Sequence, residues 1–370
     1  MNVVFAGGGT AGHVFPALAA ADLLREKHGA HVTFIGASDG QEAALVPAAG
    51  YPFVPVHVSS AQTRVSLKAV RALWQAFAAS RRCRSVVAAA DVAVGIGGYA
   101  SAPAVLAARR VRTPLVLVEQ NSVPGAVNRV AARWARVIAT TFESTRDHLP
   151  RGVPVRRTGN PLRAEIRVVP QERAELRSEA GRVFDLEPGR TTVGVFGGSQ
   201  GARHLDEAIA EALPAMSGRR DLQMLVATGP EHLGIVTSAI DEKAALLVRP
   251  FPFIQRMELA LAATDVAVSR AGSGHLAELA ACGIPAILVP YPHATENHQE
   301  SNARELETLG AAEVVLDDDL STDLLSARIQ ALVADDARRS AMAAAMRAWA
   351  LPDADELLAD LILETGGAVP

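Results

Sequence analysis

Short apolar runs rich in β-branched residues alternate with longer stretches of helical periodicity along the whole chain. A strand buried on both faces reads as a continuous apolar run, and regular alternation of such runs with helices is typical of βαβ units in a parallel sheet. In the first half the pattern predicts strands at Val3–Ala6, Val32–Ile35, Phe53–Val56, Val92–Gly95, Leu115–Val118, Val137–Thr140 and Val155–Arg157. In the second half it predicts strands at Thr192–Phe196, Gln223–Ala227, Ala245–Val248, Val266–Ser269, Ala286–Val289 and Ala312–Leu316.

The two halves open alike, since Val3–Thr10 and Val193–Ala202 each read as a strand that ends in a glycine loop before a helix. This repetition predicts an α/β protein with two Rossmann-like domains that face each other across a cleft. Ligands of such sheets bind beyond the carboxyl ends of the strands, so the cleft is the expected site. We expect domains at residues 1–160 and 161–345, and a helical segment at 346–370 that packs back on the first domain.

Composition narrows the classes of function. The 370 residues suffice for two domains, and a hydrophobic fraction of 49% supplies their cores. A net charge of −4 argues against a general nucleic-acid-binding protein. Two distant cysteines, Cys83 and Cys282, form neither a disulfide framework nor a zinc motif. We expect no signal peptide, and no apolar run reaches the ~18 residues of a membrane-spanning helix, so any membrane contact is expected to be peripheral.

A first candidate phosphate site is the loop Gly7-x-Gly9-x-x-Gly12, which opens a helix whose free N–H groups favour an anion. His13 lies at that helix start, where it would act as a general base, steady a phosphate or make a structural hydrogen bond. The motif also marks dinucleotide-binding proteins, but Gly36-Ala37-Ser38 follows the second strand, where those proteins carry an acid.

Two more glycine loops follow predicted strands. Gly197–Arg203 offers a second phosphate cradle, to which the Ser199 hydroxyl would add a donor. In Gly97–Ser101, Tyr99 either lines an acceptor site or packs in the interior.

The segment Ser269–Glu278 predicts a strand, a glycine turn and a helix that presents Glu278. This carboxylate suits two adjacent hydroxyls of a ribose, although a helix glutamate is also commonly solvated. Farther on, the amides of Gln299 and Asn302 are candidates to bind sugar hydroxyls. Asp317-Asp318-Asp319 could be mistaken for a metal site, but its place between a strand and a helix start favours a solvated loop.

Taken together, these motifs resemble those of the MurG family, the peptidoglycan N-acetylglucosaminyltransferases that convert lipid I to lipid II. The similar segments occur in order over residues 1 to 303 and are Gly8–His13, Gly97–Ser101, Glu119–Asn121, Gly159–Arg163, Gly197–Arg203, the helix with Glu278, and His298–Asn302. Ala11 stands where the family has a glycine.

The resemblance implies the GT-B architecture and inverting transfer of N-acetylglucosamine from UDP-N-acetylglucosamine to the muramoyl C4 hydroxyl of undecaprenyl-diphospho-muramoylpentapeptide. We expect no cofactor or metal, because helix N-termini, backbone donors and Arg163 could stabilise the leaving diphosphate. The resemblance also implies a lipid I acceptor on the first domain and the donor mainly on the second. The residues that it places at the donor are Thr10, Ala11, Gly12, Asn121, Arg163, Ser199, Ile254, Ser273, Gly274, His275, Leu276, Ala277, Glu278 and Gln299. His13 is favoured as the general base, with Glu119 as the competitor.

A basic amphipathic segment predicts contact with anionic lipid. The resemblance implies that this surface is the cytoplasmic face of the bacterial plasma membrane. Its apolar positions at helical spacing are Leu67, Val70, Leu73, Trp74 and Phe77, and its basic ones are Arg64, Lys68, Arg71, Arg81, Arg82 and Arg84. No acidic residue occurs between Glu42 and Asp91. The alternative is a core-facing helix with solvated basic residues.

Three other functions remain open at this point. One is a GT-B glycosyltransferase that acts on a different lipid or natural-product acceptor, which would share the donor half alone. The second is a UDP-sugar epimerase on a similar scaffold, and the third is a non-catalytic binding subunit.

Overall fold

The computed structural model describes residues 1–8, 11–58, 67–198 and 201–367, with residues 11 and 67–75 described by their backbone alone. The chain divides into two compact units. Unit 1 comprises Met1–Arg163 together with Leu351–Pro370, and unit 2 comprises Ala164–Ala350. The expectations for the side chains of Thr10, Ala11 and Ser199 lie outside the described residues.

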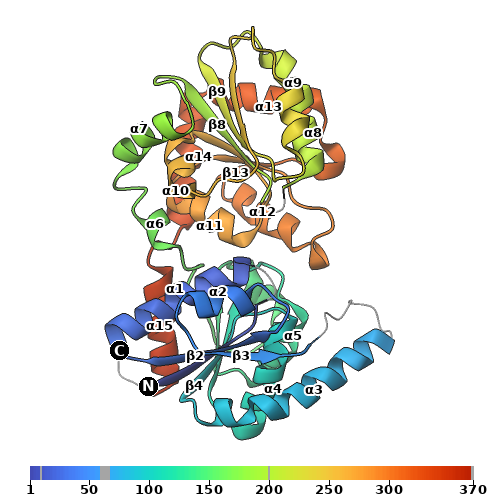
Figure 1. Cartoon of the computed structure of the whole chain (residues 1–370), viewed down its shortest axis with the longest axis vertical. Coiled ribbons are helices and arrows are strands. Elements are labelled where there is room, and N and C mark those ends of the chain that lie inside the picture. Colours follow the sequence, from blue (N-terminus) through green and yellow to red (C-terminus); the bar gives the residue numbers. More distant parts are fainter. Residues whose placement is uncertain (9–10, 59–66, 199–200, 368–370) are drawn as a thin grey trace. The chain divides into compact units, whose positions relative to one another are not determined.

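Unit 1 contains a seven-stranded parallel sheet in the order β3-β2-β1-β4-β5-β6-β7 (Figure 1). Its strands are β1 (Asn2–Ala6), β2 (His31–Ala37), β3 (Phe53–Val56), β4 (Val92–Gly95), β5 (Leu115–Glu119), β6 (Val137–Thr140) and β7 (Val155–Arg157). The strand order reverses between β1 and β4, which makes the sheet doubly wound. The carboxyl ends of these two strands are therefore the expected ligand position.

Helices cover both faces of this sheet because alternate strand residues point to opposite sides. In β5, Val116 and Val118 belong to one apolar cluster, and Leu115 and Leu117 belong to the other. The first cluster includes residues of α1 (Ala11–His28), α2 (Glu42–Ala48) and α15 (Ala354–Thr365). The second includes residues of α3 (Leu67–Ala88), α4 (Ala102–Val111) and α5 (Ala126–Ala131).

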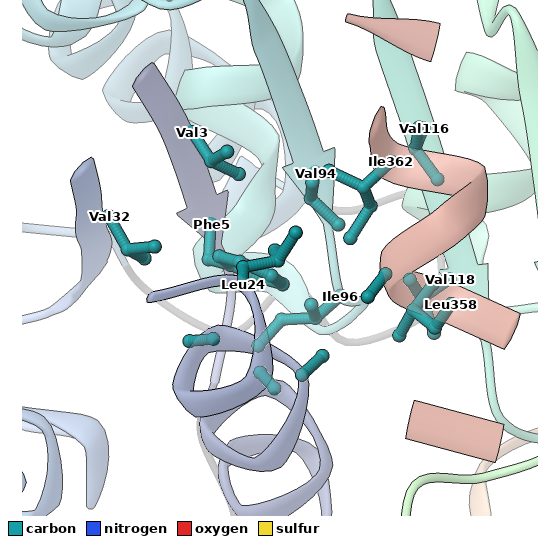
Figure 2. Packing of buried hydrophobic residues seen from close by; sticks show 14 of the residues in the cluster. Val3, Phe5, Leu24, Val32, Val94, Ile96, Val116, Val118, Leu358 and Ile362 are labelled. Carbon is teal, nitrogen blue, oxygen red and sulfur yellow. The ribbon is translucent and has the colours of Figure 1, made fainter. Parts of the chain in front are cut away.

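The helix α15 completes the first of these clusters although it comes from the far end of the chain. Figure 2 shows its Leu358 and Ile362 against Val94, Val116 and Val118 of the sheet. It also packs along α1.

Unit 2 contains a six-stranded parallel sheet in the order β10-β9-β8-β11-β12-β13. Its strands are β8 (Thr191–Phe196), β9 (Leu222–Ala227), β10 (Leu247–Phe251), β11 (Val266–Ser269), β12 (Ala286–Leu288) and β13 (Ala312–Val314). Its helices are α6 (Ala164–Arg167), α7 (Arg173–Val183), α8 (Arg203–Met216), α9 (Leu233–Ala239), α10 (Met257–Ala263), α11 (Ser273–Ala281), α12 (His298–Thr308), α13 (Thr322–Ala334) and α14 (Asp336–Trp349). This sheet is also doubly wound, with its switch point between β8 and β11.

The prediction of two parallel-sheet α/β domains is confirmed, and a strand is present at every predicted position. The largest shift concerns Ala245–Val248, because β10 begins at Leu247 and extends to Phe251. That extension includes Pro250, which has no N–H to donate. Since β10 lies at the edge of its sheet, proline is tolerated there. None of the described helices has the length and apolar character needed to cross a membrane.

Candidate active site

At the switch point of unit 1, two predicted glycine loops lie against each other. A β-carbon added at Gly98 would lie 2.6 Å from the carbonyl oxygen of Gly8, and one at Gly7 would lie 2.5 Å from that of Gly97. Both distances are shorter than a side chain tolerates, and Gly98 also has a φ of 71°. The close approach of the two backbones therefore depends on glycine.

His13 lies in the first turn of α1 and is half-buried beside the second loop. A β-carbon at Gly97 would lie 3.4 Å from Cδ2 and 3.5 Å from Nε2 of His13, and 3.8 Å from Nδ2 of Asn128. The imidazole edge therefore borders Gly97, and Asn128 borders the same glycine. Gly12 is exposed at the helix start.

Glu119 ends β5 and is buried. Its Oε1 accepts from the N–H of Asn121 at 3.0 Å. Its Oε2 accepts from the N–H of Gly125 at 3.0 Å and from Nδ2 of Asn128 at 2.9 Å. Burial raises the pKa of Glu119, and these hydrogen bonds offset the rise only in part. The carboxyl group thus organises the loop that carries Asn121, and Asn128 links it to the surroundings of His13.

Glu42 supports the same region and was missed in the sequence analysis. It begins α2, is buried, and its Oε1 accepts from the N–H of Ala37 at 2.8 Å. Added β-carbons at Gly8 and at Gly40 would both collide with its carboxyl group. The fold brings Gly8, Gly40 and Glu42 together from separate positions of the chain, and no local sequence motif predicts this contact.

Tyr99 begins a short 3-10 helix, Tyr99–Ser101, directly after the second loop, and is half-buried. Burial raises the pKa of its phenol, and the negative charges of Asp39 and Glu42 raise it further. Tyr99 is therefore a neutral hydrogen-bonding group at neutral pH. Arg163, at the end of the first segment of unit 1, has its guanidinium carbon 5.9 Å from the centre of the Phe15 ring.

At the switch point of unit 2, Gly201 of the loop after β8 lies close to Thr228 and His232, which follow β9. Gly201 has a φ of 78°, and a β-carbon there would lie 3.0 Å from Nδ1 of His232. His232 in turn contacts the buried carboxylate of Asp206 at 3.2 Å. Burial raises the pKa of Asp206 to about 6, although the nearby His232 opposes the rise.

The turn after β11 is fixed by side chains of α12. Gln299 Oε1 accepts from the N–H of Ala271 at 3.1 Å and from that of Tyr291 at 3.0 Å. Asn302 Nδ2 donates to the carbonyl of Ala271 at 3.2 Å. These bonds present Gly272 as the N-cap of α11, so the free N–H groups of that helix follow the turn. The two amides predicted to bind sugar thus have a first role in shaping the turn.

Glu278 lies on α11 one turn after His275, and both are half-buried. Its Oε2 lies 3.1 Å from His275 Nδ1, and the histidine ring packs edge-on against Phe196 with centroids 4.9 Å apart. Within α11, Ser273, Leu276 and Ala277 are buried and Gly274 is half-buried. Ile254 is buried in the segment between β10 and α10.

The acidic run differs from the expectation of a solvated loop. Asp317 is buried beneath the turn, where it forms an ion pair with Arg270 and lies 2.8 Å from His204 Nδ1. Burial would raise the pKa of Asp317, but the hydrogen bonds from His204 and Arg270 outweigh this and hold it below its ordinary range. Asp318 and Asp319 are exposed as expected. Among the described residues no cluster of three His, Cys, Asp or Glu side chains could hold a metal ion.

Comparison with known proteins identifies the chain's relatives. The glycosyltransferase family 28 N-terminal domain matches residues 3–140, and the family 28 C-terminal domain matches residues 192–358. A UDP-N-acetylglucosamine--N-acetylmuramyl-(pentapeptide) pyrophosphoryl-undecaprenol N-acetylglucosamine transferase of a Nocardioides species is 40% identical over 99% of this chain and 98% of its own length. The chain belongs to the MurG family.

Further MurG relatives agree in length and fold. The transferase of Desulforamulus reducens is 36% identical over 98% of this chain and 97% of its own length. The crystal structure of Acinetobacter baumannii MurG is similar with a TM-score of 0.79 and 27% identity, covering 98% of this chain and 99% of that one. The resemblance seen in the sequence motifs is therefore confirmed, and with it a hexosyltransferase of the MurG type.

Proposed function

We propose that this protein transfers N-acetylglucosamine from UDP-N-acetylglucosamine to the muramoyl C4 hydroxyl of undecaprenyl-diphospho-muramoylpentapeptide, which converts lipid I to lipid II in peptidoglycan synthesis. The observation that carries the proposal is the full-length similarity to transferases of that name. Glycine-lined strand ends at both switch points are consistent with it, because backbone N–H groups there favour diphosphates.

We assign the donor mainly to the strand ends of unit 2. The N-terminus of α11 would face the diphosphate and stabilise the charge that develops as UDP leaves. Glu278 would accept hydrogen bonds from the two ribose hydroxyls. His275 would then have to give up its contact with Oε2 of Glu278. Since Oε1 of Gln299 already holds the turn, its Nε2 is the atom left for the sugar.

The remaining donor contacts are proposed from the sequence motifs. Ile254 would bind uracil through its backbone, and the segment Ser273–Ala277 would follow the diphosphate and ribose. The other proposed contacts are Thr10, Ala11, Gly12, Asn121, Arg163 and Ser199, with Tyr99 at the acceptor.

For the general base we propose His13. Its imidazole is half-buried and borders a glycine loop at the switch point, so it would be available to an acceptor hydroxyl bound there. The carboxylate of Glu119 is buried and already accepts from Asn121, Gly125 and Asn128, so it is the weaker candidate. We therefore interpret Glu119 as a positioning residue.

The pair of variants His13→Gln and Glu119→Gln tests this division of roles. We expect His13→Gln to lower kcat by about 10²–10⁴-fold, the usual contribution of a general base, with little change in the Kd of UDP-N-acetylglucosamine. Glu119→Gln should lower kcat less and also lower the melting temperature. An unchanged kcat in His13→Gln would remove this residue from the mechanism.

The function itself is tested by incubating the protein with labelled UDP-N-acetylglucosamine and the lipid-linked acceptor. We expect labelled lipid II, little product with UDP-glucose, and the same rate with a chelator. Release of UDP or an epimerised sugar without acceptor would instead favour a UDP-sugar epimerase. Transfer only to other acceptors would favour a different GT-B glycosyltransferase.

We also propose that α3 attaches the protein to the cytoplasmic face of the plasma membrane. In the described half of α3, Cys83 and Val87 are buried against the unit, whereas Phe77, Arg81 and Arg84 are exposed. An exposed aromatic ring flanked by guanidinium groups suits the interface of an anionic bilayer. The side chains of Leu67, Val70, Leu73 and Trp74, and the basic Arg64, Lys68 and Arg71, lie outside the described part.

Vesicle flotation tests the attachment. We expect the protein to float with vesicles that contain phosphatidylglycerol and to remain below with neutral vesicles. Phe77→Asp together with Arg81→Gln should reduce flotation, whereas Arg25→Gln on α1 should not. Equal flotation of all variants would exclude α3 as the attachment site.

A further inference from the structure

A cavity in unit 2 lies away from the proposed donor site. Its volume is about 530 Å³. Its lining includes Thr191, the first residue of β8, as well as Asp265 and Pro285, which directly precede β11 and β12. In a parallel sheet these positions share one edge, and the glycine loop and the α11 turn follow the opposite ends of the same strands. The cavity is therefore distinct from the proposed active site.

Five arginines line this cavity, which we call the arginine cavity. Arg173 and Arg177 come from α7, Arg190 directly precedes β8, and Arg339 and Arg347 come from α14. Three separate segments of the chain thus direct guanidinium groups to one place.

Arg173 and Arg177 share one carboxylate. Arg177 binds both oxygens of Asp265, at 2.7 and 2.8 Å, and Arg173 lies 3.8 Å from the same group. Arg173 also donates to the carbonyls of Ala262 and Thr264, at 3.3 and 2.6 Å. These carbonyls hold the guanidinium in place but do not neutralise its charge.

The other arginines leave a further positive charge. Arg190 pairs with Glu187, and Arg339 pairs with Asp336. In the described parts of the chain no carboxylate lies within ion-pair distance of Arg347. Five guanidinium groups therefore share three carboxylates, which leaves a surplus of two positive charges.

Burial and the surplus positive charge both lower the pKa of Arg173. Burial lowers the pKa of Arg173, Asp265 opposes this, and the charges of Arg177 and Arg347 lower the pKa further. Like charges that are held together and partly removed from water are stabilised by an anion between them.

We propose that the arginine cavity binds a phosphate-bearing anion with at least two negative charges, such as a diphosphate group. Guanidinium forks match the geometry of phosphate oxygens, and Thr191 and Ser340 add hydroxyl groups to the lining. The described lining has no aromatic side chain on which a base could stack, so phosphate rather than a nucleobase determines the ligand class.

Calorimetry with pyrophosphate tests the proposal on the full chain. Pyrophosphate is titrated without UDP, because the diphosphate of UDP would itself compete for the arginine cavity. We expect a binding site for pyrophosphate besides the donor site, with an affinity that falls as salt rises. Arg347→Gln should weaken it about tenfold or more, because one charge-assisted contact is lost. Arg347 makes no ion pair in the described structure, so the fold should tolerate this change.

Arg182→Gln is the matched control, since Arg182 is exposed on α7 and outside the lining. If Arg347→Gln proves unstable, Ser340→Asp places a negative charge in the cavity and should also abolish binding. Absence of a second site for pyrophosphate, or equal affinity of the Arg347→Gln and Arg182→Gln variants, would overturn the proposal.

Binding to vesicles distinguishes a lipid headgroup from a soluble phosphate compound as the source of this anion. The vesicle experiment uses the Phe77→Asp/Arg81→Gln variant, in which attachment through α3 is reduced. If the natural ligand is a lipid headgroup, vesicles with phosphatidic acid should bind this variant, pyrophosphate should release it, and the addition of Arg347→Gln should weaken the binding. If it is a soluble phosphate compound, pyrophosphate should bind but should not affect vesicle association.

Discussion

Replacing Asp317 with Asn should destabilise unit 2 and weaken its affinity for the donor. The change keeps the side-chain size but removes the charge opposite Arg270, which is only 8% exposed. Arg270 keeps the carbonyls of Val289 and Pro290, each 3.2 Å from its Nη1. Breaking a buried ion pair from one side costs roughly 3–5 kcal/mol. Because these carbonyls remain, we expect a loss of about 3 kcal/mol, at the lower end of that range.

The assay is urea unfolding, with Asp318→Asn as the control because Asp318 is the exposed neighbour. For a unit of this size, 3 kcal/mol corresponds to a fall in melting temperature of about 6–12 °C. Arg270 directly precedes the turn that leads into α11, so calorimetry should also show a severalfold weaker Kd for UDP-N-acetylglucosamine. Asp318→Asn should change neither quantity.

The dependence on pH provides a second measurement. The pKa of Asp317 lies below its ordinary 3.8 in the folded state, because the hydrogen bonds of His204 and Arg270 outweigh burial. Its contribution to stability is therefore complete above pH 3.8 and is lost as the pH falls through the folded value. The difference between the wild type and Asp317→Asn should be full at about pH 6 and shrink below about pH 4. Equal stability of Asp317→Asn and Asp318→Asn at neutral pH would refute the reasoning.

Three further changes test other parts of the structure. Gly40→Ala should lower the melting temperature and raise the KM for the acceptor, because the added methyl group would collide with the carboxyl group of Glu42. An unaltered KM would show that the contact with Glu42 does not support the glycine loop that contains Gly8. Gly234→Ala, in α9 with open space around it, should instead raise the free energy of unfolding by about 0.5–1 kcal/mol in urea titrations. Ile362→Ala should cost about 2–5 kcal/mol in the same titrations, since the side chain is fully buried; a loss below about 1 kcal/mol would mean that α15 contributes little to unit 1.

The sequence was informative where the physical signal is local. Buried parallel strands are continuous apolar runs, so strands such as Val92–Gly95 and Val266–Ser269 were predicted with the bounds that the structure shows. Glycine loops after strands were equally visible, because tight turns and close backbone approach require glycine at fixed spacing. The family motifs added the expected donor and acceptor residues.

Contacts between distant positions could not be predicted in this way. Asp317 is polar and lies in an acidic run, so the sequence favours solvent, yet its partners Arg270 and His204 are 47 and 113 residues away. Glu42 likewise reads as a helix-start carboxylate, and its burial depends on glycines of two other segments. Such residues are identified only when the fold brings their partners together.

The position of α15 has a consequence for the order of events during synthesis on the ribosome. The apolar face that the nascent first 163 residues leave uncovered is filled by Leu358, Ile362 and their neighbours, which emerge only after all of Ala164–Ala350 has been translated. Until then the sheet surface beside α1 stays open to water and to other chains, as an exposed aggregation-prone surface. The earliest part of the polypeptide can therefore reach its final state only after Ala354–Thr365 has been synthesised and has left the ribosome.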